Sequence, residues 1–395
     1  MNLAAPIHFL LGGGGALPLR AIVVAFGGGL IASITPPAWR RGVLGVTGVL
    51  GAILIYGRAT LGFAASCAIA YAVGKLLCLL ANPRRRWDLS CVAMIIAALT
   101  FFIGRHRGWA QVHVSVSGYA LIPFSLDMWL VLRIVSFFWE VGARRTEDVD
   151  LGSFTSWIAL PFTFAGPLIR YAAFKKQLTT TATTSASALT TLRQMPWWRE
   201  LGVALMHMAG GVIAAALMVG LPSTGSPLVH FAKKVGDIFV FAPWSFYLGV
   251  GGALRFFECA AVLAGVALPP SFDKPFQQRN LSEFWKRWNM TVTNMLRDYL
   301  FYNRWGFRTP NAYVNTLVLF VAVGLWHSTD FFWFTWGLLH GIGFCIFLWF
   351  HRRRGKPLLG PRLGKFLSIA VTYVFVCSCW AAPPKILLLA HHFLH

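Results

Sequence analysis

The chain has 395 residues, of which 57% are hydrophobic, 15% aromatic and only 12% charged. A soluble globular domain carries about 25% charged residues, so this composition excludes a soluble enzyme, and the hydrophobic content excludes a disordered chain. The 35 lysines and arginines outnumber the 13 acidic residues and give a net charge of +22. We therefore expect a polytopic membrane protein.

Apolar stretches follow one another along the whole chain. They cover residues 5–38, 42–81, 87–104, 109–141, 151–169, 201–221, 236–268, 312–328, 331–350 and 366–391. Several reach the length that spans a bilayer core, and the longest can hold two helices, which predicts an all-α protein with about 10–12 membrane helices. Gly27–Gly29 indicates either a break or a point of close packing. Because no soluble domain can be separated, we expect one integral membrane domain over residues 1–395.

Short basic clusters lie between the apolar stretches. Such clusters are typical of cytoplasmic loops and of contacts with lipid head groups. The alternative is docking of an acidic cytosolic partner, such as a carrier protein, whereas a nucleic-acid partner is not expected. The clusters are Arg40–Arg41, Arg84–Arg86, Arg144–Arg145, Lys175–Lys176, Lys233–Lys234 and Arg352–Arg354.

The seven cysteines all lie in apolar stretches. Their number is odd and their spacing matches no metal-binding motif, so we expect buried hydrophobic side chains and no metal site.

Residues 269–308 differ from the rest of the chain because basic and aromatic side chains are mixed there without a spanning apolar run. From Leu281 to Tyr299 the apolar residues follow helical spacing and fill one face, with most of the basic residues opposite. Asn280 and Glu283 have capping-box spacing, which predicts that the helix begins there. An amphipathic helix of this kind belongs at a membrane interface or in a cytoplasmic funnel.

Three polar residues in or beside apolar surroundings are candidates for chemistry. Asn289 lies at the edge of the apolar helix face, where it either caps a neighbouring backbone group or points into a buried polar site. His327 closes the apolar run 312–326 and is a candidate general base, because titratable side chains at membrane depth are costly unless they have a role. The alternative is an interfacial histidine that donates to a backbone carbonyl. His340, within the next apolar run, has the same two interpretations.

Four charged residues lie inside apolar stretches, namely Asp127, Arg133, Glu140 and Glu258. Intramembrane charges usually pair with one another or line a water-filled pathway. Structural pairing is the first interpretation, and a transport pathway is the alternative.

Three segments resemble the membrane-bound O-acyltransferase family, in particular its bacterial branch with alginate O-acetyltransferase and teichoic-acid D-alanyltransferase. The first is a Gly-Pro segment at Leu160–Tyr171. The second combines Phe272–Phe276, Asn280–Asn289 and Leu296–Leu300, and the third combines Gly324–His327 and Trp336–Gly341. The resemblance covers about residues 155–350, which we take as the catalytic core, between N-terminal helices in 1–150 and a basic loop with a last helix in 351–395.

The chain departs from the bacterial pattern in two places. Bacterial members usually carry histidine where this chain has Asn289, and asparagine is similar to what lipid- and protein-acylating members use. The tract Trp244–Gly251 lacks the acidic residue that bacterial members usually carry there.

The resemblance implies a ring of tilted helices around a tunnel, with amphipathic helices forming a cytoplasmic funnel. It implies that His327 takes the proton of an acceptor hydroxyl and that Asn289 holds the thioester carbonyl or orients the acceptor. No cofactor is expected to stay bound, because acyl-CoA or an acyl-carrier-protein thioester serves as donor substrate. The tunnel and funnel residues implied are Trp285, Arg287, Trp288, Arg297, Asp298, Trp326 and His340.

The expected reaction moves an acyl group, acetyl rather than aminoacyl, to a hydroxyl of an extracytoplasmic polysaccharide or envelope glycan. Alternatives are a lipid, lipid-linked or small-metabolite acceptor and, in another class, a transporter or flippase or a non-catalytic scaffold of an export complex. The expected partners are membrane lipids, the donor, and polysaccharide-export or acyl-relay proteins, and the expected location is a bacterial inner membrane.

Overall fold

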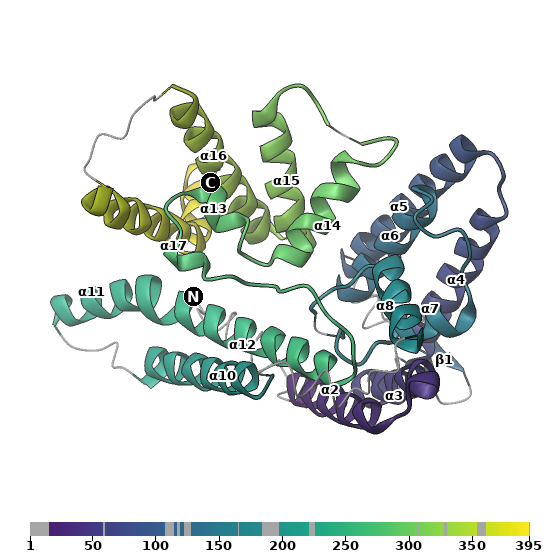
Figure 1. The fold of residues 1–395 in the computed structure, drawn as a ribbon. Helices are drawn as coiled ribbons and strands as arrows, with labels where there is room; N and C mark the ends of the chain where they lie inside the picture. The colour runs from purple at the N-terminus through teal and green to yellow at the C-terminus, as the bar shows by residue number, and fades with distance from the viewer. Residues whose placement is uncertain are drawn as a thin grey trace.

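The computed structural model describes residues 16–57, 60–106, 114–116, 119–121, 128–164, 166–183, 197–220, 226–306, 308–327, 330–353 and 361–394. Helices dominate this part of the chain (Figure 1), which confirms the all-α class. Seven of the described helices are long and apolar enough to cross a membrane, and two shorter apolar helices lie at Arg20–Ile34 and Ala312–His327. A polytopic membrane protein is therefore confirmed, while the tunnel and the funnel stay predictions.

The first group of helices lies mainly on the right in Figure 1. It comprises α2 (Ala16–Ile34), α3 (Pro37–Tyr56), α4 (Thr60–Cys78), α5 (Pro83–His106), α6 (Met128–Gly142), α7 (Leu151–Ile158) and α8 (Tyr171–Thr183). Between α5 and α6, strands β1 (Val114–Val116) and β2 (Tyr119–Leu121) form an antiparallel hairpin.

The second group runs along the lower left of Figure 1 and packs against α2. It comprises α10 (Trp197–Gly220), α11 (Pro227–Gly236), the π turn η3 (Asp237–Phe241) and α12 (Ala242–Leu263). A Cβ at Gly29 of α2 would lie 2.6 Å from the carbonyl oxygen of Ala260 in α12. Of the two interpretations of Gly27–Gly29, close packing is therefore the right one, because α2 continues through these residues without a break.

The third group contains most of the predicted site and lies at the upper left and centre of Figure 1. It comprises η4 (Pro275–Gln277), α13 (Leu281–Trp285), α14 (Met290–Phe301), α15 (Ala312–His327), α16 (Phe331–Arg353) and α17 (Pro361–Leu394). Helices α15 and α16 pack against each other, and a Cβ at Gly324 would clash with the carbonyl oxygen of Trp333. This close approach holds the end of α15 against the beginning of α16.

The predicted continuous helix from Leu281 to Tyr299 is wrong, although its beginning is right. The Oδ1 of Asn280 accepts a hydrogen bond of 2.9 Å from the backbone N–H of Glu283 and caps α13. The helix ends at Trp285, and a new helix begins after Asn289, whose φ of 42° is left-handed. Asparagine tolerates this conformation better than most residues with a Cβ, so the chain turns there and α14 begins.

The charged residues of the apolar stretches have backbone partners. Arg133 donates to the carbonyl of Ile158 at 2.6 Å, Glu140 accepts from the N–H of Ala172 at 3.2 Å, and Glu258 accepts from the N–H of Ser271 at 2.9 Å. Each charge therefore fixes one segment against another, which is a structural role. The fourth residue, Asp127, lies outside the described residues.

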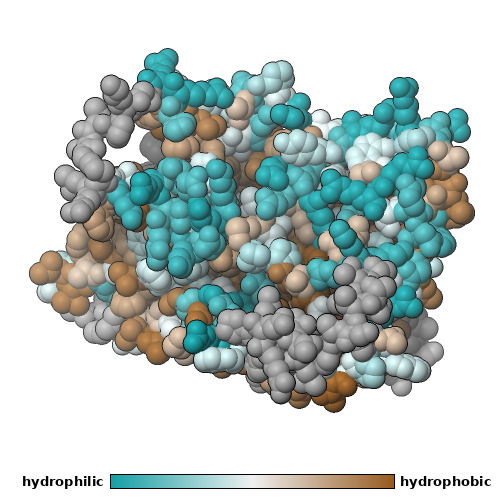
Figure 2. Space-filling model, in the orientation of Figure 1, coloured by the Kyte–Doolittle hydropathy of each residue, from teal (hydrophilic) through white to brown (hydrophobic). Residues whose placement is uncertain are grey.

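The basic clusters are only partly at the surface. Arg86 is fully buried and donates to the carbonyls of Val141 and Thr146 at 2.7 and 2.6 Å, so its expected contact with lipid head groups is wrong. Arg40 is buried as well. Figure 2 shows polar residues gathered over the upper half of one face, with apolar residues at its left and right edges.

Of the seven cysteines, all are free, five are buried and two are partly buried, as the sequence predicts.

Candidate functional site

His327 lies at the end of α15, where the chain turns into α16. Its ring stacks almost parallel on Trp333, with ring centres 4.3 Å apart and an interplanar angle of 15°. It also contacts the edge of Trp336, at 5.8 Å, and the ring of Trp326, at 4.6 Å. The imidazole is therefore held by three indoles in a partly buried position.

Trp326 connects this region to the first group of helices. Its ring meets Trp129 of α6 edge to face at 5.6 Å. The side chain is buried, so the residue anchors the end of α15 against α6.

His340 lies in the middle of α16 and is only 1% exposed. Its ring contacts Trp336 at 4.6 Å and Trp285 of α13 at 4.9 Å. Within the described part of the chain, neither of its ring nitrogens has a hydrogen-bond partner, and the same holds for the Nε1 atoms of Trp285 and Trp336. Buried polar atoms are nearly always partnered in proteins, so four unpartnered nitrogens in contacting rings mark a place suited to a polar ligand.

Trp336 lies between the two histidines, because its ring contacts both of them. We call His327, Trp333, Trp336, His340 and Trp285 the histidine–tryptophan cluster. Three helices build it, because its members come from α13, α15 and α16.

Asn289 occupies the N-cap position of α14, and backbone hydrogen bonds of the residues around it fix this turn against the loop 271–273. The N–H of Met290 donates to the carbonyl of Ser271 at 2.9 Å, and the N–H of Asp273 donates to the carbonyl of Arg287 at 3.1 Å. The side chain of Asn289 makes no capping hydrogen bond, and its buried Oδ1 has no partner among the described residues. Of its two predicted roles, the buried polar site fits this arrangement and the cap does not.

A path of ring contacts leads from the neighbour of Asn289 to the histidine–tryptophan cluster. Trp288 stacks on Phe246 at 5.8 Å, Phe246 contacts Trp380 at 5.4 Å, and Trp380 contacts Trp333 at 5.5 Å. This path connects Trp288, the chain neighbour of Asn289, with Trp333, on which His327 stacks.

The basic residue Arg287 is engaged in ion pairs on a more exposed flank. It binds Glu283 at 2.6 Å and Asp273 at 3.2 Å. Hydrogen bonds from Arg287 and then Lys286 hold the pKa of the Glu283 carboxyl below its usual range. Arg287 therefore braces α13 against the preceding loop, and its funnel role stays a prediction.

Asp298 brings the Gly-Pro segment to α14. One of its carboxylate oxygens binds Arg170, which belongs to that segment, and the other binds Arg297 at 3.2 Å. The guanidinium of Arg170 also lies 4.9 Å from the ring centre of Trp139 in α6. All three sequence segments that resemble one family therefore meet around α14, α15 and α16.

Sequence reasoning missed several residues that build the site, above all Trp129, Phe246, Trp333 and Trp380. The only available signal was the abundance of tryptophan, 17 residues in the chain. In the described ranges, no three His, Cys, Asp or Glu side chains come together as a metal site would require.

Comparison with known proteins gives one family and several relatives. The profile of the family described as "MBOAT, membrane-bound O-acyltransferase family" matches residues 123–390. A Pseudomonas putida protein named "Probable alginate O-acetylase" is 26% identical over 317 residues, which cover 76% of this chain and 61% of the relative. A teichoic acid D-alanyltransferase of Streptococcus thermophilus is 24% identical over 67% of this chain and 69% of the relative.

A third relative matches a shorter region. The peptidoglycan O-acetyltransferase of Helicobacter pylori is 30% identical over 118 residues, 29% of this chain and 22% of its own length. The chain spans about three fifths of the length of the alginate O-acetylase that it matches.

Proposed function

The chain belongs to the membrane-bound O-acyltransferase family, and from this premise we propose that it moves an acyl group, acetyl in the first instance, from a cytosolic thioester to a hydroxyl of an envelope polymer. The donor in this proposal is acyl-CoA or an acyl-carrier protein, and the location is a bacterial inner membrane. The names of the relatives support a polymer acceptor, because they refer to alginate, teichoic acid and peptidoglycan.

The observation that carries the proposal is the setting of His327. Its imidazole lies against three indoles and next to a buried group of unpartnered nitrogens, at a helix end in an otherwise apolar region. In the proposed reaction His327 takes the proton of the acceptor hydroxyl while that oxygen attacks the thioester carbonyl carbon. The carbon–sulfur bond then breaks, and the leaving thiolate takes the proton from the imidazolium. The indoles keep water from hydrolysing the thioester.

Asn289 has the orienting role in this proposal. An amide oxygen can only accept hydrogen bonds, and the unpartnered Oδ1 of Asn289 is buried. It therefore suits a second hydroxyl or an N–H of the substrate, which would fix the acceptor or donor relative to His327. Its NH₂ group can donate to the thioester carbonyl as negative charge develops on that oxygen.

The test is release of free thiol from acetyl-CoA by the purified chain in nanodiscs, with a hydroxylated polymer added as acceptor because water is excluded from the site. We expect that His327→Ala and His327→Gln each slow release by about a hundred- to ten-thousandfold. The matched control is His351→Ala, because His351 is exposed near the end of α16, the helix that follows His327, and is not part of the histidine–tryptophan cluster. Normal turnover in both His327 variants would refute the role of His327. If the wild type is inactive with acetyl-CoA, carrier-bound and longer thioesters are tested with the same variants.

The acceptor needs a separate experiment. Membranes that contain the chain receive a radiolabelled acetyl donor, and the label is then followed into polymer, lipid and small-molecule fractions. We expect label in the polymer fraction that depends on His327. Label in lipid or in a small metabolite would retain the enzyme and correct the acceptor.

A further inference from the structure

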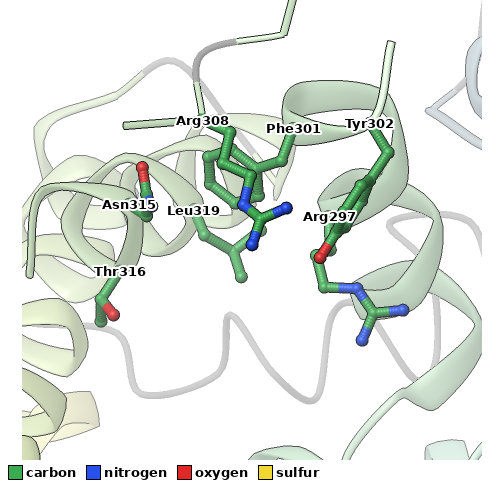
Figure 3. Close-up of a pocket in the computed structure, with 7 residues that line it drawn as sticks. All are labelled: Arg297, Phe301, Tyr302, Arg308, Asn315, Thr316 and Leu319. Carbon is green, nitrogen blue, oxygen red and sulfur yellow. The ribbon is translucent and has the colours of Figure 1, made fainter. Parts of the chain in front are cut away.

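An open pocket of about 190 Å³ lies between α14 and α15, and no member of the histidine–tryptophan cluster lines it. Figure 3 shows the Arg308 side chain extending into the space between Tyr302 and Leu319, with the Arg297 guanidinium on the Tyr302 side. Its lining combines two guanidinium groups, a phenol, a hydroxyl and an apolar floor. The main lining residues are Arg297, Phe301, Tyr302, Arg308, Thr316 and Leu319.

The pocket is preorganised around Arg308. Asn315 of α15 donates from its Nδ2 to the carbonyl of Thr309 at 2.8 Å and accepts at Oδ1 from the N–H of Thr309 at 2.9 Å. These two bonds fix the backbone immediately after Arg308. The guanidinium carbon of Arg308 also lies 5.4 Å from the ring centre of Tyr302, a cation–π contact that orients the side chain.

The pocket carries excess positive charge. Asp298 neutralises the charge of Arg297 only in part, because the other oxygen of its carboxylate binds Arg170. Across the described ranges, no acidic side chain forms an ion pair with Arg308. Two guanidinium groups whose positive charge is not fully neutralised by acidic side chains match the geometry and the charge of a phosphate group.

The surroundings of the pocket are those of a membrane–water boundary. The apolar helix α15 begins at Ala312, directly beside the pocket. Tyr302, which lines the pocket, is 50% exposed, and Trp305, between the two helices, and Val314, in the first turn of α15, are 46% and 41% exposed. Exposed tyrosine and tryptophan in the segment that leads into an apolar helix are typical of the head-group level of a bilayer.

We propose that this pocket binds the phosphate group of an anionic phospholipid. Arg297 and Arg308 would donate to the phosphate oxygens, and Phe301 and Leu319 would contact the glycerol and the first part of the acyl chains. A nucleotide phosphate of a thioester donor has the same chemistry, but it has no need of the exposed aromatic and apolar rim. The proposal concerns lipid binding alone and is independent of the proposed acyl transfer.

The experiment measures thermal stabilisation of the delipidated full-length chain in nonionic detergent. The probes are short-chain phosphatidylglycerol, short-chain phosphatidylcholine and coenzyme A. We expect phosphatidylglycerol to stabilise the wild type more than phosphatidylcholine, and Arg308→Ala and Arg297→Ala each to weaken its apparent affinity at least about tenfold. The apparent affinity of Arg308→Lys for phosphatidylglycerol should lie between those of the wild type and Arg308→Ala, because lysine keeps the positive charge but lacks the two-pronged guanidinium group.

The matched control is Arg353→Ala, which removes one exposed positive charge that stacks on Trp349 and does not line the pocket. It should leave the response to phosphatidylglycerol unchanged. An equal loss in this control would overturn the proposal in favour of nonspecific surface charge. Stabilisation by coenzyme A that depends on Arg297 and Arg308, without a response to phosphatidylglycerol, would assign the pocket to a donor phosphate instead. Equal responses to the two lipids would also overturn it.

Discussion

Replacement of His340 by phenylalanine should stabilise the protein and abolish turnover at the same time. The wild-type imidazole is 1% exposed, and neither ring nitrogen has a partner among the described residues. Leaving a buried polar group without a partner costs about 1–3 kcal/mol. Phenylalanine removes both nitrogens and keeps an aromatic ring against Trp285 and Trp336, which lie at 4.9 and 4.6 Å.

The opposing effect is the larger ring. Overpacking a well-packed core costs about 1–3 kcal/mol. Removal of two unpartnered nitrogens recovers up to about 2–6 kcal/mol, twice the cost of one such group. With about 2–6 kcal/mol relieved and about 1–3 kcal/mol lost, the mid-range values leave a net gain of about 2 kcal/mol in the free energy of unfolding.

The assay is reversible unfolding in mixed micelles with a rising fraction of denaturing detergent, followed by tryptophan fluorescence, together with thiol release from the thioester. The matched control is His207→Phe, because His207 lies on α10 beside Tyr247 and is only partly buried. It should change neither quantity much. If His340→Phe lowers the free energy of unfolding, or leaves turnover intact, the inference that these nitrogens serve a ligand is refuted.

Three further predictions concern α13 and α14. Asp298→Asn leaves the partly buried Arg170 without its carboxylate and should destabilise the chain by about 1–3 kcal/mol in the same unfolding assay, with Arg170→Met in the Asp298→Asn background restoring most of the loss. Asn289→Gly should keep the left-handed turn, so its free energy of unfolding should stay within about 1 kcal/mol of the wild-type value, while the rate of thiol release falls by about a hundredfold. An unchanged rate would limit Asn289 to a backbone role. Because the pKa of Glu283 is lowered, its ion pair with Arg287 stabilises the fold above the ordinary glutamate pKa, and this stabilisation is lost as the pH falls through the lowered pKa. Glu283→Gln should therefore reduce the loss of stability at acid pH. An unchanged stability–pH curve in this variant would argue against a contribution of the pair.

The helical class could be predicted from the sequence because it depends on a property that each apolar stretch carries by itself. The beginning of α13 could be predicted for the same reason, because its signal is local: Asn280 and Glu283 are three residues apart. The break at Asn289 was not predictable from periodicity, because a left-handed φ at one residue leaves the apolar spacing on both sides intact. The burial of Arg86 depends on carbonyls more than fifty residues away, which hydropathy does not register.

The candidate site divides in the same way. His327 and Asn289 stand out in the sequence because polar side chains are unusual beside apolar runs. The residues around them do not stand out in the sequence. Trp333 and Trp380 look like ordinary residues of membrane helices, and they come into contact only through the packing of α16 and α17. The ring contacts that hold His327 are tertiary, and a single sequence contains no measure of them.

The charged residues of the apolar stretches differ from His340 in their hydrogen-bond partners, and the difference indicates where a substrate would bind. Glu140 and Glu258 each accept from a backbone N–H of another segment, and Arg133 donates to the carbonyl of Ile158, while its Nη2 has no partner among the described residues. These three charges therefore hold segments of the fold together. His340 instead lies among indoles, with both nitrogens unpartnered in the described part of the chain. A neutral imidazole can both donate and accept hydrogen bonds, which suits the hydroxyl and carbonyl groups of an acyl-transfer reaction better than the charge of an ion. This contrast favours acyl transfer over transport and directs the first substitutions to the histidine–tryptophan cluster.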